Sequence, residues 1–269
     1  NFQNFTWNNP SQVTPGALVS DINIAGNLTL TAGTLNLAAN KLIYSGSSIS
    51  RTSGNINGLS GTVEFTNPVG IPLTLNPNIF SANTVANLIK NDYGFLNLNN
   101  NQIVSNTLTL SRGSVFINGG TSLTVSGNIV GSAAPNGYLQ SYANSSLILN
   151  NTAAITLPNG GTPLFTFLQQ PSNVAGIANL TLSGTGAVNL SSDLTVENSL
   201  TTNSGTSLVL GSNNLTLNGT ISSTTQIKGS VTSSLTIGGS GSASIGLEQT
   251  SAATRSLLNY NQSRNATVT

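Results

Sequence analysis

Few residues in this chain could carry out acid–base chemistry. Its 269 residues include no His and no Cys, and the carboxylates are Asp21, Glu64, Asp92, Asp193, Glu197 and Glu248. Hydrolysis of a glycosidic bond needs two carboxylates facing the same bond, and a calcium site needs several oxygen ligands. Asp193 and Glu197 are four residues apart, which pairs side chains on a helix but not along strands and turns. We therefore predict no catalytic residue, no metal site, no cofactor and no enzyme.

Two of these carboxylates follow an internal repeat. Asp21 and Asp193 occupy equivalent positions in different units, and Gln102 lies between them in the series. A residue that recurs in register with a repeat is typical of a turn or of the edge of a coil. Stacked coils could still bring carboxylates together from distant parts of the sequence, so a carbohydrate-degrading β-helix stays as an alternative.

The charged residues are sparse. Lys and Arg number 7, Asp and Glu number 6, and the net charge is +1. Binding to nucleic acid or to an anionic membrane surface needs clustered Lys and Arg, whereas here they are spread singly and suit solvated turns. No run of 18 apolar residues is present, which excludes a membrane-spanning helix. We expect neither nucleic acid as a partner nor insertion into a membrane.

Aromatic side chains are the residues best suited to bind a ligand. Trp7 and the five tyrosines could stack on sugar rings, namely Tyr44, Tyr93, Tyr138, Tyr142 and Tyr260. We name Trp7, Tyr44, Tyr93 and Tyr138 as candidate glycan contacts. Packing in the core or at an edge is the competing explanation for all four. The many Thr residues also permit ice binding, although Asn, Ile or Val often takes the place of Thr.

The elements that would position these residues belong to a long repeat of roughly 80–90 residues. Short sequence motifs, here called phrases, recur in successive units. Equivalent positions in one such phrase are occupied by Phe5, Leu88, Leu180 and Leu258. A Gly followed closely by an Ile closes another phrase in each unit, as at Gly46, Gly127 and Gly219. The expected units are 1–82, 83–174, 175–253 and the start of a fourth at 254–269. Because the pattern is already under way at Asn1 and continues to Thr269, we expect the chain to be a segment of a longer array.

The local pattern predicts short β-strands. Phrases such as Leu28-Thr29-Leu30 and Leu215-Thr216-Leu217 alternate apolar and polar residues, which places both Leu side chains on one face of a strand. Strands of roughly 3–6 residues, separated by Gly, Asn and Ser, favour a parallel β-helix over tandem Ig-like sandwiches, whose strands are longer. With coils of about 20–23 residues, each unit would hold about four coils, and the whole chain would form a rod about 55–60 Å long.

Two runs carry a resemblance to a known family. The segments 184–196 (GTGAVNLSSDLTV) and 213–221 (NNLTLNGTI) resemble the β-strand repeats of very large Bacteroidetes surface proteins. The most similar members are the giant gliding-motility adhesins of the SprB type. The resemblance covers essentially the whole chain. It implies export by the type IX secretion system, display on the outer cell surface and movement by the gliding motor.

The sequence therefore predicts a shaft or adhesive segment of a large bacterial cell-surface adhesin, involved in surface attachment and gliding motility. Its expected partners are neighbouring repeats of the same chain, surface polysaccharide or a solid substrate and, by resemblance, the gliding and secretion machinery. The location would be extracellular, with attachment to the outer membrane through other parts of the protein. The alternatives are a polysaccharide-binding or polysaccharide-degrading β-helix and a string of Ig-like adhesin domains.

Overall fold

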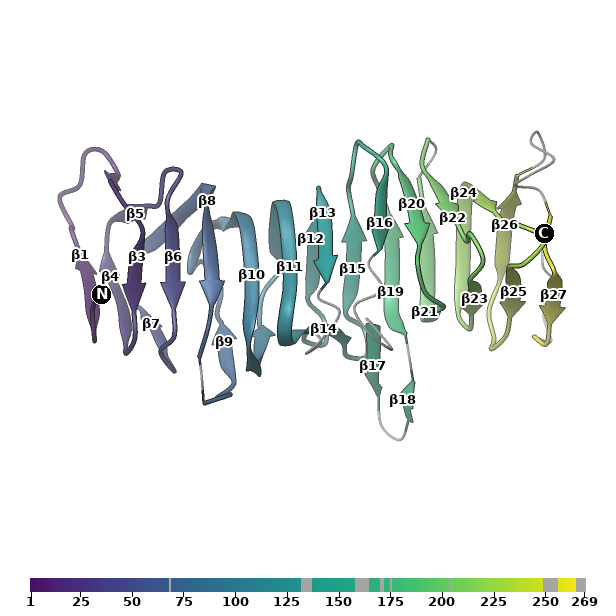
Figure 1. The fold of residues 1–269 in the computed structure, drawn as a ribbon, viewed down its shortest axis with the longest axis horizontal. Coiled ribbons are helices and arrows are strands. Elements are labelled where there is room, and N and C mark those ends of the chain that lie inside the picture. Colours follow the sequence, from purple (N-terminus) through teal and green to yellow (C-terminus); the bar gives the residue numbers. More distant parts are fainter. Residues whose placement is uncertain are drawn as a thin grey trace.

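The chain folds as a parallel β-solenoid of about 11 turns (Figure 1). The computed structural model describes residues 1–67, 69–131, 137–157, 165–169, 172–174, 176–203, 205–248 and 256–264. The elements within these residues are all β-strands, and no helix able to cross a bilayer occurs among them. With a spacing of about 4.8 Å between paired strands, the coils form a rod about 53 Å long. The predicted β-helix is confirmed, and the Ig-like alternative is wrong because neighbouring strands pair in parallel.

Each coil contributes a strand segment to each of three rows, in a fixed order along the chain. Several strands are long enough to turn a corner and to belong to two or three rows, namely β8 (Asn55–Phe65), β10 (Phe80–Leu98), β11 (Gln102–Ile117), β19 (Ile177–Leu182), β21 (Leu194–Thr202), β24 (Thr220–Lys228) and β26 (Ala243–Leu247). In β10 the pairing register shifts between Val85 and Asn87, which is the local irregularity that lets a strand bend.

The strands outside the corners complete the rows. Row 1 contains β1 (Phe5–Asn8), β4 (Leu28–Ala32), β7 (Ile49–Arg51), β9 (Leu73–Leu75), the ends of β10 and β11, β14 (Gly137–Ser141), β17 (Phe165–Gln169), the starts of β19 and β21, β23 (Asn214–Leu217), β25 (Ser234–Ile237) and β27 (Asn259–Gln262).

Row 2 contains β2 (Gly16–Ala17), β5 (Thr34–Asn36), the starts of β8, β10 and β11, β12 (Ser122–Val125), β15 (Ser146–Leu149), the ends of β19 and β21, and the starts of β24 and β26. Row 3 contains β3 (Ile22–Ile24), β6 (Lys41–Tyr44), the end of β8, the middle parts of β10 and β11, β13 (Asn128–Gly131), β16 (Ile155–Leu157), β20 (Ala187–Leu190), β22 (Ser207–Val209), and the ends of β24 and β26.

One coil carries an insertion. Leu147 in β15 pairs with Leu180 in β19, whereas Leu108 pairs with Ile129, so the chain between the first two residues is much longer than an ordinary coil. The extra length includes β17 and β18 (Ser172–Val174), which pair with each other in antiparallel fashion. Figure 1 shows this hairpin extending beyond the stacked coils.

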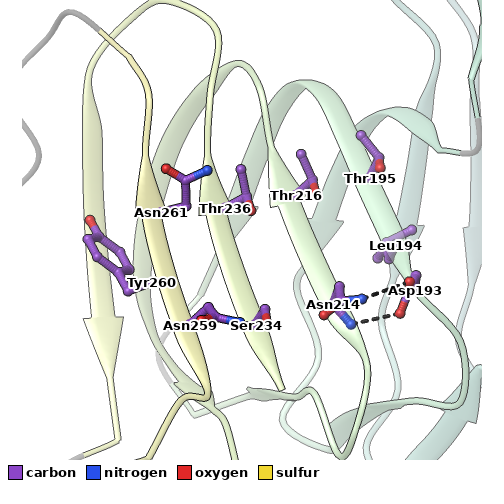
Figure 2. A pocket seen from close by; sticks show the side chains of 10 residues that line it. All are labelled: Asp193, Leu194, Thr195, Asn214, Thr216, Ser234, Thr236, Asn259, Tyr260 and Asn261. Carbon is purple, nitrogen blue, oxygen red and sulfur yellow. Dashed lines mark hydrogen bonds between the residues drawn. The ribbon is translucent and has the colours of Figure 1, made fainter. Parts of the chain in front are cut away.

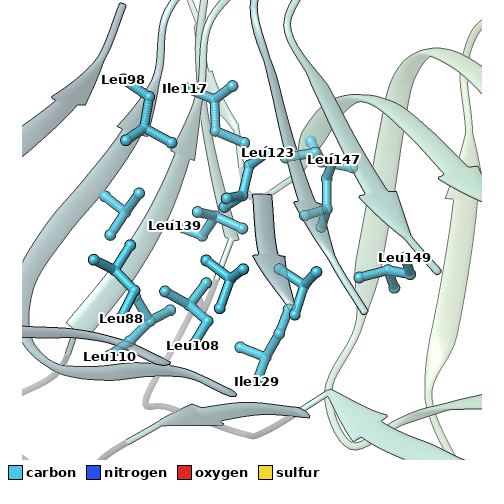
Figure 3. Packing of buried hydrophobic residues seen from close by; sticks show 14 of the residues in the cluster. Leu88, Leu98, Leu108, Leu110, Ile117, Leu123, Ile129, Leu139, Leu147 and Leu149 are labelled. Atoms are coloured by element: carbon cyan, nitrogen blue, oxygen red, sulfur yellow. The ribbon is translucent and has the colours of Figure 1, made fainter. Parts of the chain in front are cut away.

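Aliphatic side chains fill the interior in columns that run along the rod (Figure 3). Leu88, Leu108 and Ile129 occupy one position in three successive coils and are almost completely buried. Leu123 and Leu147 continue a column in row 2 in the same way. Burial of each such side chain stabilises the fold by roughly 1.5–3 kcal/mol, so the alternating phrases of the sequence account directly for the core.

The recurring glycines lie where one coil rests on the previous one. A Cβ added at Gly46 would lie 1.7 Å from the carbonyl oxygen of Gly26, and at Gly127 it would lie 1.9 Å from that of Asn106. At Gly219 the distance to the carbonyl oxygen of Asn198 would be 1.8 Å. These positions need Gly because the backbones approach too closely for any side chain.

The repeat does not correspond to a whole number of coils. Leu28 lies in row 1, its counterpart Leu108 lies in row 3, and Leu200 lies in row 2. Phe5 and β27 both lie in row 1, three units apart. Each unit therefore spans one strand fewer than four coils, and successive copies of a phrase step back by one row. The number of coils in each unit is therefore slightly smaller than the predicted value of about four.

The stacking of coils continues without a break across the predicted unit boundary that lies within the described residues. β10 runs through the boundary at residues 82 and 83, and Phe80 pairs with Ile56 in the coil before it. Residue 175 and residues 253–254 lie outside the described part of the chain, as do residues 265–269.

Candidate functional site

Five aromatic residues lie on the outer face of row 1 or just beside its edges. Tyr93, Phe95, Phe116, Tyr138 and Tyr142 come from β10, β11 and β14 and the residue that follows it, and we call this set the aromatic platform. The exposed fractions are 65% for Tyr93, 43% for Phe95 and 45% for Tyr142, whereas Phe116 and Tyr138 are half-buried. Exposed aromatic clusters of this kind mark interaction surfaces more often than single exposed apolar residues do.

Strand register brings the platform together from three coils. Phe95 pairs with Ser114, which pairs in turn with Tyr138, so Phe95 and Tyr138 point to the same side two coils apart. Phe116 lies on the neighbouring line of the same face, between Asn97 and Gln140. Between these outward residues, Leu96, Val115 and Leu139 point inward and are fully buried.

The platform has ring contacts of its own. The rings of Phe116 and Tyr142 are 6.1 Å apart at an interplanar angle of 60°. The guanidinium carbon of Arg112 lies 5.4 Å from the centre of the Tyr93 ring, within the range of a cation–π interaction. These contacts restrain the rings while leaving much of their surface open to solvent.

A buried ion pair supports the segment that carries Tyr93. Lys90 Nζ lies 2.5 Å from Asp92 Oδ1, and it also donates to the Asp92 carbonyl oxygen at 3.0 Å. Asp92 Oδ1 accepts a further hydrogen bond from the backbone N–H of Gly94 at 2.7 Å. Burial lowers the pKa of Lys90 from its ordinary value, and Asp92 partly offsets this effect. The pair fixes the residues on both sides of Tyr93.

A second outward surface lies on row 1 near the last described coils, and it is polar (Figure 2). It is a shallow depression. Thr195, Thr216, Thr236 and Asn261 form one line across β21, β23, β25 and β27. Asn214, Ser234 and Asn259 form the next line, and Asn214 donates to Asp193 through its backbone N–H at 2.8 Å and its side-chain amide at 2.9 Å.

The six carboxylates each have a partner. Three of them form ion pairs: Glu64 with Lys41 at 2.9 Å, Asp92 with Lys90, and Glu248 with Lys228 at 3.7 Å. Glu197 accepts from the Asn218 side chain at 2.9 Å. In the part of the chain that the structure describes, no group of three or more Asp, Glu, His or Cys side chains could hold a metal ion.

Asp21 and Asp193 perform the same structural task, as their repeat register indicated. Asp21 accepts from the backbone N–H of Lys41 in the next coil at 2.8 Å, as Asp193 does from that of Asn214. The intermediate member of the series is Asn101, which accepts from the N–H of Ser122 at 3.0 Å, and not Gln102. Gln102 points inward and is fully buried, so the sequence alignment was wrong by one residue.

The four aromatic residues predicted to contact a glycan differ in their locations and burial in the structure. Tyr93 and Tyr138 lie on the platform. Tyr44 is only 1% exposed, its hydroxyl hydrogen-bonds to Ser48, and its ring packs edge-on against Phe65, so its assignment as a glycan contact is wrong. Trp7 is half-buried and packs against the core at the first coils, away from the platform.

Sequence reasoning missed Phe95 and Phe116, whereas Tyr142 was among the tyrosines expected to be able to stack on sugars. The alternation of Phe95 with the buried Leu96 and Gly94 places Phe95 at an outward position, and this signal was readable from the sequence. Two basic residues also depart from the expectation of solvated turns: Lys90 and Arg264 are buried. Arg255 lies outside the described residues.

No family model, no curated protein and no solved structure matches this chain.

Proposed function

We infer that this chain is a segment of the shaft of a large extracellular bacterial adhesin, and that it contributes to surface attachment and gliding motility. The observation that carries this proposal is the uninterrupted stacking of coils through the repeat, as where β10 crosses the first predicted boundary. A solenoid of this kind grows in one dimension, because each coil contacts only its neighbours. Its length is therefore proportional to the number of repeats, which suits a stalk.

The outer surface suits a chain that works outside the cell with few charges. The described strands expose lines of Thr, Asn and Ser on row 1, and the aromatic platform gives the rod a place for contact. The resemblance of segments 184–196 and 213–221 to gliding adhesins adds the cell surface, the type IX route and the gliding motor to the proposal. The partners would be adjoining repeats together with the secretion and gliding machinery.

Labelling of intact source cells tests the location and the shaft role. Antibodies raised against the purified chain should label the surface of unpermeabilised cells, and negative-stain images of the parent protein should show a continuous rod that bears the label. Deletion of these residues should shorten the rod by about 53 Å. Labelling only after permeabilisation, or separate beads along the parent protein, would contradict the proposal.

A further inference from the structure

We propose that the aromatic platform binds a neutral polysaccharide, whose chain lies along the rod axis across the three coils of β10, β11 and β14. The inference concerns a property of the purified chain, so it stands or falls separately from the cellular role as a shaft.

The first argument is the arrangement of rings and polar groups. Phe95 and Tyr138 lie two coils apart on one line, which corresponds to about 10 Å along the rod. On the neighbouring line, Asn97 and Gln140 flank Phe116, and Thr74 lies next to Asn97. A sugar ring has an apolar C–H face and a rim of hydroxyl groups. Rings that pack on the face, beside amides and hydroxyls that reach the rim, complement both parts, and the coil spacing is comparable with one residue of an extended sugar chain.

The second argument is charge. Within the platform the charged contact is Arg112, which lies over the Tyr93 ring, while Lys90 and Asp92 neutralise each other below it. A strongly anionic ligand would meet only one cation there, and a cationic ligand would meet no free carboxylate among these residues. The complementary ligand is therefore uncharged and rich in hydroxyl groups. A hydrophobic protein partner fits less well, since Thr74, Asn97 and Gln140 lie among the rings.

The third argument is rigidity. Phe95, Phe116 and Tyr138 project from paired strands, and the buried ion pair fixes the backbone next to Tyr93. Gly113 lies against this segment, where a Cβ would come within 2.2 Å of the Asp92 carbonyl oxygen. Aromatic side chains held on rigid strands lose little conformational entropy when they bind.

Affinity electrophoresis of the purified chain tests the proposal. The gels contain soluble neutral polysaccharides in turn, namely hydroxyethylcellulose, laminarin, dextran, galactomannan and low-melting agarose, with an anionic alginate gel for comparison. At least one neutral polysaccharide should retard the chain, and retardation should persist in about 0.5 M NaCl because no ionic contact is required. Retardation in no neutral gel, or in alginate alone, would overturn the proposal.

Variants locate the binding surface. Tyr93→Ala and Phe95→Ala should each weaken retardation by about threefold to tenfold, the usual worth of one aromatic contact. Thr216→Ala in the polar depression and Tyr260→Ala are the matched controls and should bind as the parent does, with all variants checked by thermal unfolding. Loss of binding in Thr216→Ala with full binding in both platform variants would refute the assignment to the platform.

Discussion

Lys90 and Asp92 form an ion pair inside the coil, at a place where neighbouring coils carry apolar side chains. In the strand register, Lys90 stands between Phe65 and Leu110, both of which belong to the buried core. The ammonium group therefore interrupts an apolar column, and Asp92 compensates for its charge. Such a pair contributes little net stability but is costly to break.

Removal of Asp92 should therefore destabilise the chain strongly. We expect Asp92→Ala to lower the free energy of unfolding by about 3–5 kcal/mol, because Lys90 is left buried without its counter-charge. The double variant Lys90→Leu with Asp92→Asn should return to within about 1 kcal/mol of the parent, since an apolar column is restored. Urea denaturation followed by circular dichroism measures both. A loss below about 1 kcal/mol for Asp92→Ala would show that the pair is not buried in solution.

Gly127 should tolerate no side chain. The Cβ of Gly127→Ala would collide with the carbonyl oxygen of Asn106, so we expect a loss of about 3 kcal/mol or more. Gly120 is the matched control, because it has φ +77° but no atom within 4 Å of an added Cβ. Gly120→Ala should cost only the backbone strain, about 1–2 kcal/mol. Equal losses for the two variants would contradict the steric explanation.

The stability of the chain should fall at acid pH in part through Glu64. Burial alone would raise the pKa of this carboxyl, but hydrogen bonds from Asn91 and Lys41 and the charge of Lys41 outweigh it and hold the pKa below 4.5. The stabilisation is complete above the unfolded-state value and is lost as the pH falls through the lower folded-state pKa. Thermal unfolding from pH 6 to pH 3 should decline less steeply for Glu64→Gln than for the parent. Parallel curves would refute this role.

The caps between coils should depend on an oxygen acceptor and not on charge. Asn101 performs for Ser122 what Asp193 performs for Asn214. Asp21 caps Lys41 in the same way through one carboxylate oxygen, so Asp21→Asn should change stability by less than about 0.5 kcal/mol, whereas Asp21→Ala should cost about 1 kcal/mol. Thermal unfolding of the two variants makes the comparison, and an equal loss in both would show that the negative charge matters.

Arg264 should hold the last described coils together. Its guanidinium group donates to the carbonyl oxygens of Gly219 at 2.8 Å and Gly241 at 3.1 Å. Because a solenoid is stabilised locally, Arg264→Ala should speed amide hydrogen exchange in β23, β25 and β27 and leave β4 unchanged. Arg51→Ala, which removes one exposed contact to Ser53, is the control and should leave β23, β25 and β27 unchanged. Uniform acceleration along the rod would contradict a local role.

Much of the fold was predictable because the residue types within each phrase determine the local strand and turn structure. The Leu-Thr-Leu alternation dictates which side chains point inward, and the recurring glycines mark the close contacts between coils. The row of each phrase was not predictable, since it depends on summing variable coil lengths such as the long connection between Leu147 and Leu180.

The candidate site was predictable only in part. Tyr93 and Tyr138 were identified by residue type alone, and residue type equally selected Tyr44, which is buried beside Phe65. Whether an aromatic ring faces in or out depends on its parity in the strand, and whether two such rings meet depends on pairing between residues a whole coil apart, as with Phe116 and Tyr142. Such pairing between distant residues cannot be recognised from the sequence alone.

The one-row step between units gives the rod a screw symmetry in its chemistry. A rotation of one third of a turn about the long axis, combined with a translation of one unit, superimposes a phrase on its next copy. Leu28, Leu108 and Leu200 illustrate this, because they lie in rows 1, 3 and 2. Each of the three sides of the rod therefore carries every kind of phrase once within three units.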